Sequence, residues 1–178
     1  MTRIQSLPPG LRPLFIVDAV VVEEDTYLVL GADPVPRETH EQPDGLLREA
    51  ASTLPVPPGS MLVQDGAPLK FLAVVHDLNE EPTLREEWVE AALAATIREA
   101  NRRRLRSLAL EAWGARYGSL TAERFAMLFG DALCALKPGH PEEIWLLVTP
   151  SSCSAVHDVL SRAGLSVQIE PEESGRVQ

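Results

Sequence analysis

The segment Gly114-Ala115-Arg116-Tyr117-Gly118-Ser119 has the residue types that could hold a phosphate. It follows an apolar run and precedes a helix-forming run, so it is expected to lead into a helix N-terminus, where free backbone N–H groups and the helix dipole favour anions. Its two glycines permit close backbone approach, Ser119 or Thr121 can cap the helix, and Arg116 adds a cation. The alternative is a tight strand-to-helix turn that needs glycine for its conformation alone.

Two further positions carry side chains that can react. His76 ends an apolar run, next to Asp77, at a place where a base can be aimed at a ligand. Because adjacent strand residues point to opposite faces, we expect His76 to flank a ligand rather than to form a dyad with Asp77. Cys153 falls in the first turn of an expected helix with His157 one turn further on, an arrangement that can lower a thiol pKa, although a small core cysteine is the competing interpretation.

No metal and no cofactor are predicted. His40 and His140 fall in expected loops without the spacing of metal ligands. The two cysteines, Cys134 and Cys153, are too few for a four-cysteine zinc site or a disulfide framework. The candidate site residues are therefore predicted for binding, and no catalytic residue is assigned.

Composition is typical of one folded domain. The 178 residues are 45% hydrophobic and 24% charged, which argues against disorder. Residues 1–13 are proline-bearing and predicted to be an N-terminal arm, residues 14–170 a single domain, and residues 171–178 a polar tail. No apolar run approaches the roughly 18 residues that span a bilayer, so a cytoplasmic protein is expected. The preference for arginine over lysine indicates a GC-rich bacterial genome.

Net charge narrows the partners. The formal charge is −10, from 16 basic and 26 acidic residues. Nucleic acids and anionic membranes both attract positive potential, so neither is expected as a partner. A small nucleotide or phosphate ligand, another protein, or further copies of the chain remain. The arginines between residues 98 and 106 do not indicate a surface for nucleic acid or membrane. They end a helix that begins with glutamates and so complement its dipole.

Strands and helices alternate along the chain, which predicts an α/β fold with a mostly parallel sheet covered on both faces. Strands are expected over 14–22, 27–30, 61–64, 70–77, 107–113, 143–148 and 165–170. Helices are expected over 46–52, from 83 to beyond 100, over 120–136 and over 156–163. Thr83 and Glu86 have the spacing of a capping box at the start of the second helix. Residues 73–75, 108–110 and 146–148 are predicted to be central parallel strands.

From about Phe15 to Gly164 the chain resembles the macro domain family. Three segments carry the resemblance: KFLAVVHDL, which is similar to a strand ending in a histidine-containing turn; residues 85–133, with a buried Ser-Leu-Ala strand and a loop ending in Tyr117-Gly118; and the late strand IWLLV. The resemblance implies a three-layer αβα fold with a mixed, mostly parallel central sheet. It also implies a site for ADP-ribose or a related nucleotide on residues 114–119.

The chain departs from the family at the first ligand loop. Where the family has an Asn-Ala-Ala-Asn strand end and a triple-glycine loop, this chain has Leu30-Gly31-Ala32-Asp33 and then a proline-rich loop with a single glycine, Gly45. The resemblance then makes Asp33, Gly45 and His76 ligand-flanking positions. It maps the family's adenine-contacting acidic residue onto either Asp25 or Asp18.

These departures determine the predicted function. The family's asparagines hold the distal ribose and its glycines let the diphosphate approach, so their loss predicts a non-catalytic module that binds ADP-ribose or a related nucleotide or phosphate ligand weakly. One alternative is a structural or protein-interaction domain that has lost its ligand. The other is an ADP-ribosyl or phosphoester hydrolase that uses His76 or Cys153.

The charge balance yields the first prediction. The protein should not bind duplex DNA or RNA tightly at physiological salt, because its basic residues are outnumbered. Fluorescence anisotropy with a labelled duplex checks this. Submicromolar binding that weakens steeply as salt is added would contradict it.

Overall fold

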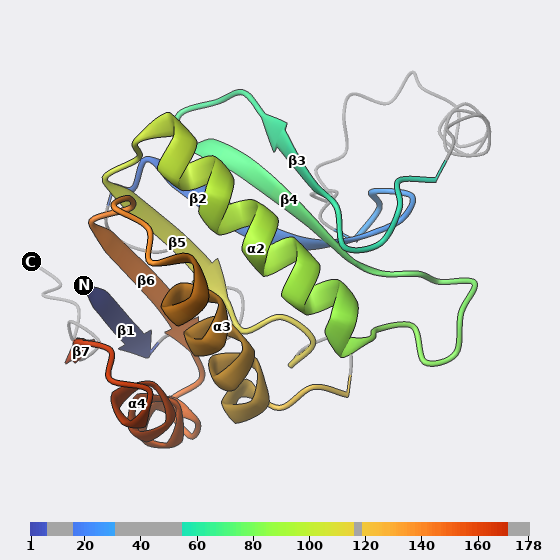
Figure 1. Ribbon diagram of the computed structural model, residues 1–178. Coiled ribbons are helices and arrows are strands. Elements are labelled where there is room, and N and C mark those ends of the chain that lie inside the picture. The colour runs from blue at the N-terminus through green and yellow to red at the C-terminus, as the bar shows by residue number, and fades with distance from the viewer. Residues whose placement is uncertain (7–15, 31–54, 116–118, 171–178) are drawn as a thin grey trace, which may run out of the picture.

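A seven-stranded sheet forms the centre of the fold (Figure 1). The computed structural model describes residues 1–6, 16–30, 55–115 and 119–170. The strands are β1 (Thr2–Ser6), β2 (Ala19–Asp25), β3 (Met61–Gln64), β4 (Leu69–His76), β5 (Ser107–Glu111), β6 (Glu143–Val148) and β7 (Val167–Glu170). Their order across the sheet is β3-β4-β2-β5-β6-β1-β7.

The sheet is mixed and mostly parallel, as predicted. Only β3 runs antiparallel, against β4, while the other neighbouring strands pair in parallel. The three predicted central strands lie inside the sheet as β4, β5 and β6, with β2 between β4 and β5. Val74, Ala109 and Leu147, at their midpoints, are buried. The carboxyl ends of all the parallel strands therefore meet at one edge.

The predicted loose arm over residues 1–13 is wrong for residues 2–6. They form β1, an inner strand between β6 and β7, and the Ile4 side chain is fully buried. The segment holds a single core residue between polar neighbours, so periodicity does not reveal it. Its burial comes from the two strands that enclose it.

The predicted strand over residues 27–30 is also wrong. These residues form a turn directly after β2. The carboxylate of Asp25 accepts backbone N–H groups from Tyr27 (2.6 Å), Val29 (3.0 Å) and Leu30 (2.9 Å). Local bonding of this kind offers the backbone an alternative to a strand ladder.

Three helices in the described part of the chain cover one face of the sheet (Figure 1). They are α2 (Glu86–Arg103), α3 (Ala122–Leu136) and α4 (Cys153–Arg162), with α2 against α3 and α3 against α4. Leu93, Phe125 and Leu160 pack from these helices onto the sheet's apolar side. None of the three is long and apolar enough to cross a membrane. The helix expected over 46–52 and the tail over 171–178 lie outside the described residues.

The predicted capping box at the start of α2 does not form. The helix begins three residues after Thr83, and its N-cap residue, Arg85, makes no side-chain cap. Residues before it stay extended, because Leu84 forms a bridge with His76 and is buried. Glu86 instead accepts two hydrogen bonds from Arg124 of α3, which lower the pKa of its carboxyl.

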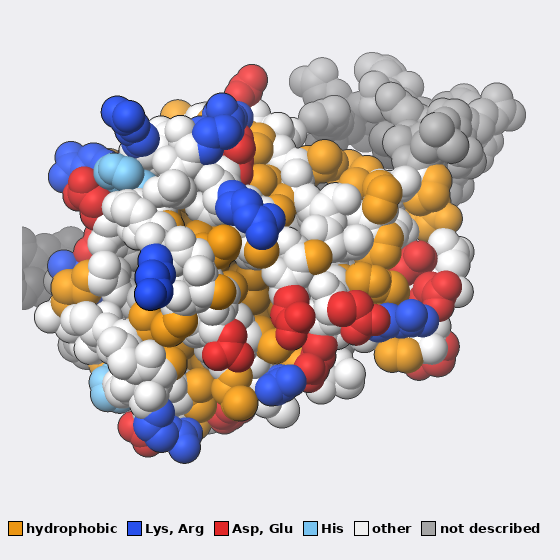
Figure 2. All heavy atoms as spheres, in the orientation of Figure 1, with side chains coloured by type: hydrophobic (Ala, Val, Ile, Leu, Met, Phe, Trp, Pro, Cys, Tyr) orange, Lys and Arg blue, Asp and Glu red, His pale blue; other side chains and the backbone are white. Residues whose placement is uncertain are grey.

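Charge is arranged along α2 as its dipole requires. Glu86 and Glu87 lie in the first turn and Arg102 and Arg103 in the last. Figure 2 shows acidic side chains gathered around the N-terminal end of this helix and basic ones around its other end. The arginine cluster is thus a solvated helix end, as predicted.

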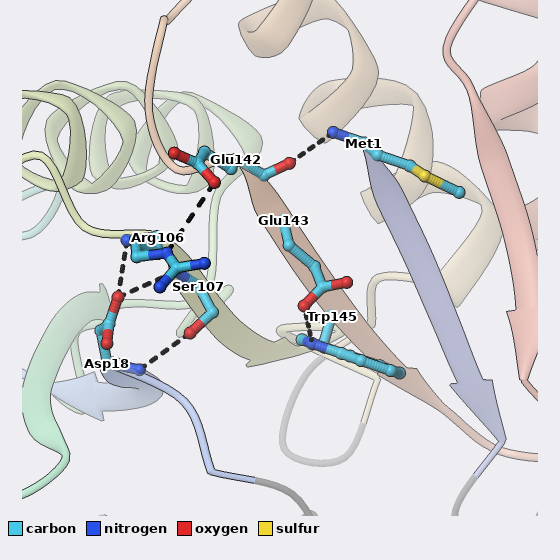
Figure 3. A network of polar contacts seen from close by, with 7 residues as sticks. All are labelled: Met1, Asp18, Arg106, Ser107, Glu142, Glu143 and Trp145. Carbon is cyan, nitrogen blue, oxygen red and sulfur yellow. Dashed lines mark hydrogen bonds and ion pairs between the residues drawn. The ribbon is translucent and has the colours of Figure 1, made fainter.

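The amino ends of the strands are tied together by a polar network (Figure 3). Asp18 accepts the backbone N–H groups of Arg106 (2.6 Å) and Ser107 (3.1 Å), and its own N–H donates to the Ser107 hydroxyl. The amino group of Met1 donates to the carbonyl of Glu142 at 2.7 Å. This edge of the sheet is therefore closed by protein contacts.

The last turn of α2 generates a pH prediction. Hydrogen bonds from Arg102 and Arg103 lower the pKa of Glu99 from its usual 4.5 to about 2. A lowered pKa in the folded state means that the charge stabilises the fold above pH 4.5 and that this contribution is lost as pH falls toward 2. Urea unfolding should show wild type more stable than Glu99→Gln at pH 6, with the difference shrinking by pH 2.5. A difference that stays constant over this range would contradict the assignment.

Candidate functional site

The carboxyl ends of β2, β4 and β5 form the edge where the predicted site residues meet. Three connections leave from it: residues 26–30 after β2, residues 77–85 after β4, and residues 112–121 after β5. The first two are joined, since Asn79 donates to the Tyr27 hydroxyl at 2.9 Å and Thr26 donates its N–H to the carbonyl of His76. In α/β sheets this is the edge at which ligands bind.

The turn after β5 is built around Gly114. Its φ is +76°, in the region that favours glycine, and a Cβ there would lie 2.8 Å from atoms of both Leu84 and Leu120. Trp113, fully buried, anchors the turn by packing edge-on against Phe125 of α3 with ring centroids 5.4 Å apart. Both the backbone conformation and the close packing at position 114 therefore require glycine.

The N–H of Gly114 points at a carboxylate. It donates to Glu23 Oε2 at 2.6 Å, and the Glu23 side chain is 10% exposed. The other oxygen, Oε1, lies 3.8 Å from Nε2 of His76, a side chain only 1% exposed. Neither Oε1 nor Nε2 has a hydrogen-bond partner within the described residues. Three strands thus bring a largely buried carboxylate, a buried imidazole and a backbone donor into one cluster.

The predicted phosphate segment is described only in part. Gly114 is buried, while Ala115 and Ser119 are exposed at the two sides of Arg116, Tyr117 and Gly118, which lie outside the described residues. Thr121, one of the two predicted caps, begins α3, and its hydroxyl accepts the N–H of Arg124 at 3.2 Å. Asp33 and Gly45, the other predicted ligand-flanking residues, also lie outside the described part.

The strand end predicted at residues 30–33 is wrong at Leu30, while residues 31–33 lie outside the described part. β2 ends at Asp25, so Val22-Glu23-Glu24-Asp25 occupies the strand end, and Leu30 already belongs to the following turn. Asp25 is fully buried and its two oxygens serve the backbone of residues 27–30. Asp18 lies at the opposite edge of the sheet. Within the described contacts, neither acidic residue presents an oxygen at the site for an adenine.

The Cys153 and His157 pair does not form. Cys153 is buried, and burial raises the pKa of its thiol instead of lowering it. The imidazole of His157 faces Asp158, with Nδ1 3.5 Å from Oδ1. Cys153 is a core residue of α4, which is the competing interpretation of the sequence.

A metal cluster and a groove on the other face of the sheet are the remaining candidates for a site in the described ranges. No group of three or more His, Cys, Asp and Glu side chains there could hold a metal ion. A groove of about 1240 Å³ runs over the sheet face opposite the helices, lined in part by Val20, Val22, Ala109 and Leu147. Of the predicted ligand residues in the described ranges, Asp18 alone lines it, and its carboxylate is bonded to the backbone of Arg106 and Ser107.

Glu23 is the site residue that sequence reasoning missed. The run Glu23-Glu24-Asp25 looks like a polar turn after an apolar strand, yet all three residues belong to β2. The signal in the sequence was the position of Glu23 at the end of a strand. A charged residue there lies at the carboxyl edge of the sheet, close to the end of a parallel neighbouring strand such as the one that His76 ends. Spacing alone could not pair it with Gly114, 91 residues away in sequence.

Comparison with known proteins relates this fold to a group of solved structures. No family model matches the sequence, and no curated protein matches it. Among solved structures, the macrodomain of Thermus aquaticus DarG is similar at 25% identity, with a TM-score of 0.57 over 83% of this chain and 98% of that one. The macrodomain of Mycobacterium tuberculosis DarG matches at 17% identity and a TM-score of 0.55, over 82% and 97%. A mutant Oceanobacillus iheyensis macrodomain with ADPR matches at 14% and 0.59, over 89% and 91%.

The Gly114 turn gives a stability prediction with a matched control. Gly114→Ala should destabilise the protein through its positive φ, at about 1–2 kcal/mol, and through overpacking, at about 1–3 kcal/mol more. Gly164→Ala has nearly the same φ, +77°, but a Cβ there meets nothing within 4 Å. It should carry the conformational cost alone. Urea unfolding of both variants checks this, and equal losses of stability would contradict the packing argument.

Proposed function

Because this chain has a macro-domain-like fold, we propose that it is a module that binds ADP-ribose or a related nucleotide at the carboxyl edge of its sheet, weakly and without hydrolysing it. One similar solved structure, the mutant Oceanobacillus iheyensis macrodomain, holds ADPR. That ligand class suits an edge where a glycine turn leads into a helix N-terminus.

The observation that carries the proposal is the hydrogen bond from the Gly114 N–H to Glu23. A carboxylate oxygen and a phosphate oxygen are both anionic acceptors for a backbone donor. The 2.6 Å bond means that the turn already directs a donor toward an oxyanion. α3 begins after Thr121, and the start of a helix has backbone N–H groups that the helix itself leaves unpaired.

Weak binding follows from the two carboxylates at the strand end. Glu23 occupies the Gly114 donor, so one charge-assisted hydrogen bond, worth about 1.5–3 kcal/mol, is already satisfied before a ligand arrives. Asp25 is engaged by three backbone N–H groups and is not available to a ribose. A ligand therefore gains fewer contacts here than at a strand end with free amides.

The proposed absence of hydrolysis rests on the surroundings of the two side chains that could react, Cys153 and His76. Cys153 lies in α4 with a raised thiol pKa, which disfavours the thiolate. His76 is at the candidate edge but is buried, and its Nε2 faces Glu23. Neither side chain has the exposed, activated setting that a nucleophile or general base requires.

A structural or partner-binding domain is the second candidate. Leu84 and Leu120 pack directly against Gly114, so apolar side chains fill the space on one side of the turn. A fold that had lost its ligand would tolerate such filling. The two candidates differ in whether the turn binds any phosphate-bearing ligand.

Calorimetric titration of the full chain with ADP-ribose separates them. The proposal expects measurable but modest binding, abolished by Gly118→Val through steric exclusion. Arg116→Ala should weaken binding less, and mainly at low salt, because the contribution of an exposed charge is screened. No heat and no thermal shift with millimolar ADP-ribose would favour the partner-binding candidate.

Hydrolysis is tested on the same protein. Incubation with an ADP-ribosylated protein should release no ADP-ribose above the uncatalysed background. Turnover that disappears in His76→Ala, with the variant still folded by circular dichroism, would overturn the non-catalytic part of the proposal.

A further inference from the structure

We propose that Glu23 is a specificity-determining residue that competes, from inside the protein, with the ligand's phosphate for the Gly114 N–H. This inference rests on the proposed function and adds how the site selects its ligand. An incoming phosphate must displace the Glu23 carboxylate, and His76 is the group that receives it. The site therefore binds a ligand more weakly when the phosphate at this turn carries more negative charge.

The first step is the fit of the carboxylate at the turn. Glu23 lies on β2 and Gly114 follows β5, and these strands are parallel neighbours whose carboxyl ends lie side by side. The carboxylate reaches across to the N–H of Gly114 at 2.6 Å, a short and charge-assisted bond. A backbone N–H has a single hydrogen, so a phosphate oxygen cannot take the same bond while Glu23 keeps it.

The second step is the place to which the carboxylate can move. His76 ends β4, on the other side of β2, and its Nε2 is 3.8 Å from Glu23 Oε1. That distance is about 1 Å too long for a hydrogen bond, and neither atom has another hydrogen-bond partner in the described ranges. A small rotation of the Glu23 side chain away from Gly114 would close the gap. Because the two atoms themselves are buried, the unfilled bond is costly, and this favours the movement.

The third step is the effect on ligand choice. A carboxylate beside the bound phosphate repels it in a poorly solvated site, and the repulsion grows with the phosphate's charge. ADP ends in a phosphate monoester with up to two negative charges, whereas each phosphate of ADP-ribose carries one. Glu23 should therefore disfavour ADP more than ADP-ribose. Removing its charge should raise both affinities and reduce the preference.

Titration of the wild-type chain and two variants tests the proposal. Glu23→Gln keeps the size of the side chain and removes its charge. Glu142→Gln is the matched control: it makes the same change at the opposite edge of the sheet, on a side chain that is 58% exposed. Each protein is titrated with ADP-ribose and with ADP at constant salt, after circular dichroism and thermal unfolding have shown that it is folded.

The expected result is at least a tenfold gain in ADP affinity for Glu23→Gln, a smaller gain for ADP-ribose, and no gain for Glu142→Gln. If wild type binds and Glu23→Gln binds equally or more weakly, the competitor role is wrong while the proposed function stands. If neither protein binds millimolar ADP-ribose or ADP, the proposed function fails, and the competitor role fails with it. Should Glu23→Gln not fold, Glu23→Ala and Glu23→Asp supply the same comparison with the carboxylate removed or withdrawn.

Discussion

The hydrogen bond between Gly114 and Glu23 joins the parts of the molecule that make the candidate site. It connects the end of β2 to the turn that leads into α3, across 91 residues of sequence. The turn can present its N–H only because Gly114 adopts a positive φ between Leu84 and Leu120. Trp113 holds the turn against α3 by packing edge-on against Phe125. The pairing of β2 with β4 and β5 determines where the Glu23 carboxylate lies. The hydrogen bond between Gly114 and Glu23 therefore depends on the sheet, on the packing of α3 and on the turn together.

The two edges of the sheet differ for a physical reason. At the amino edge, Asp18 accepts two backbone N–H groups and the amino group of Met1 donates to a carbonyl, so contacts between strands tie this edge together. At the carboxyl edge, Glu23 Oε1 and His76 Nε2 stay without a hydrogen-bond partner in the described residues. Buried polar groups normally find partners, and this unpaired pair lies at the edge where we propose that the ligand binds.

The parts of the fold that depend on local pattern were predictable, and those that depend on long-range pairing were not. Apolar runs identified β4, β5 and β6 as central strands. Of the two predicted caps of α3, Ser119 and Thr121, the structure has Thr121. β1 was missed because Ile4 is its single core side chain, buried by strands from the far end of the chain. Thr83 has capping-box spacing, but the bridge between His76 and Leu84 keeps that segment extended. Glu23 was passed over because its partners, Gly114 and His76, come from other strands.

We propose that nucleotide binding is weak because the Glu23 carboxylate already accepts the N–H of the turn, and a structure of the full chain with ADP-ribose tests this most directly. The predicted result is a phosphate oxygen within hydrogen-bond distance of the Gly114 nitrogen, with Glu23 turned away and its carboxylate bonded to Nε2 of His76. The contradicting result is bound ADP-ribose with the 2.6 Å bond between Gly114 and Glu23 intact.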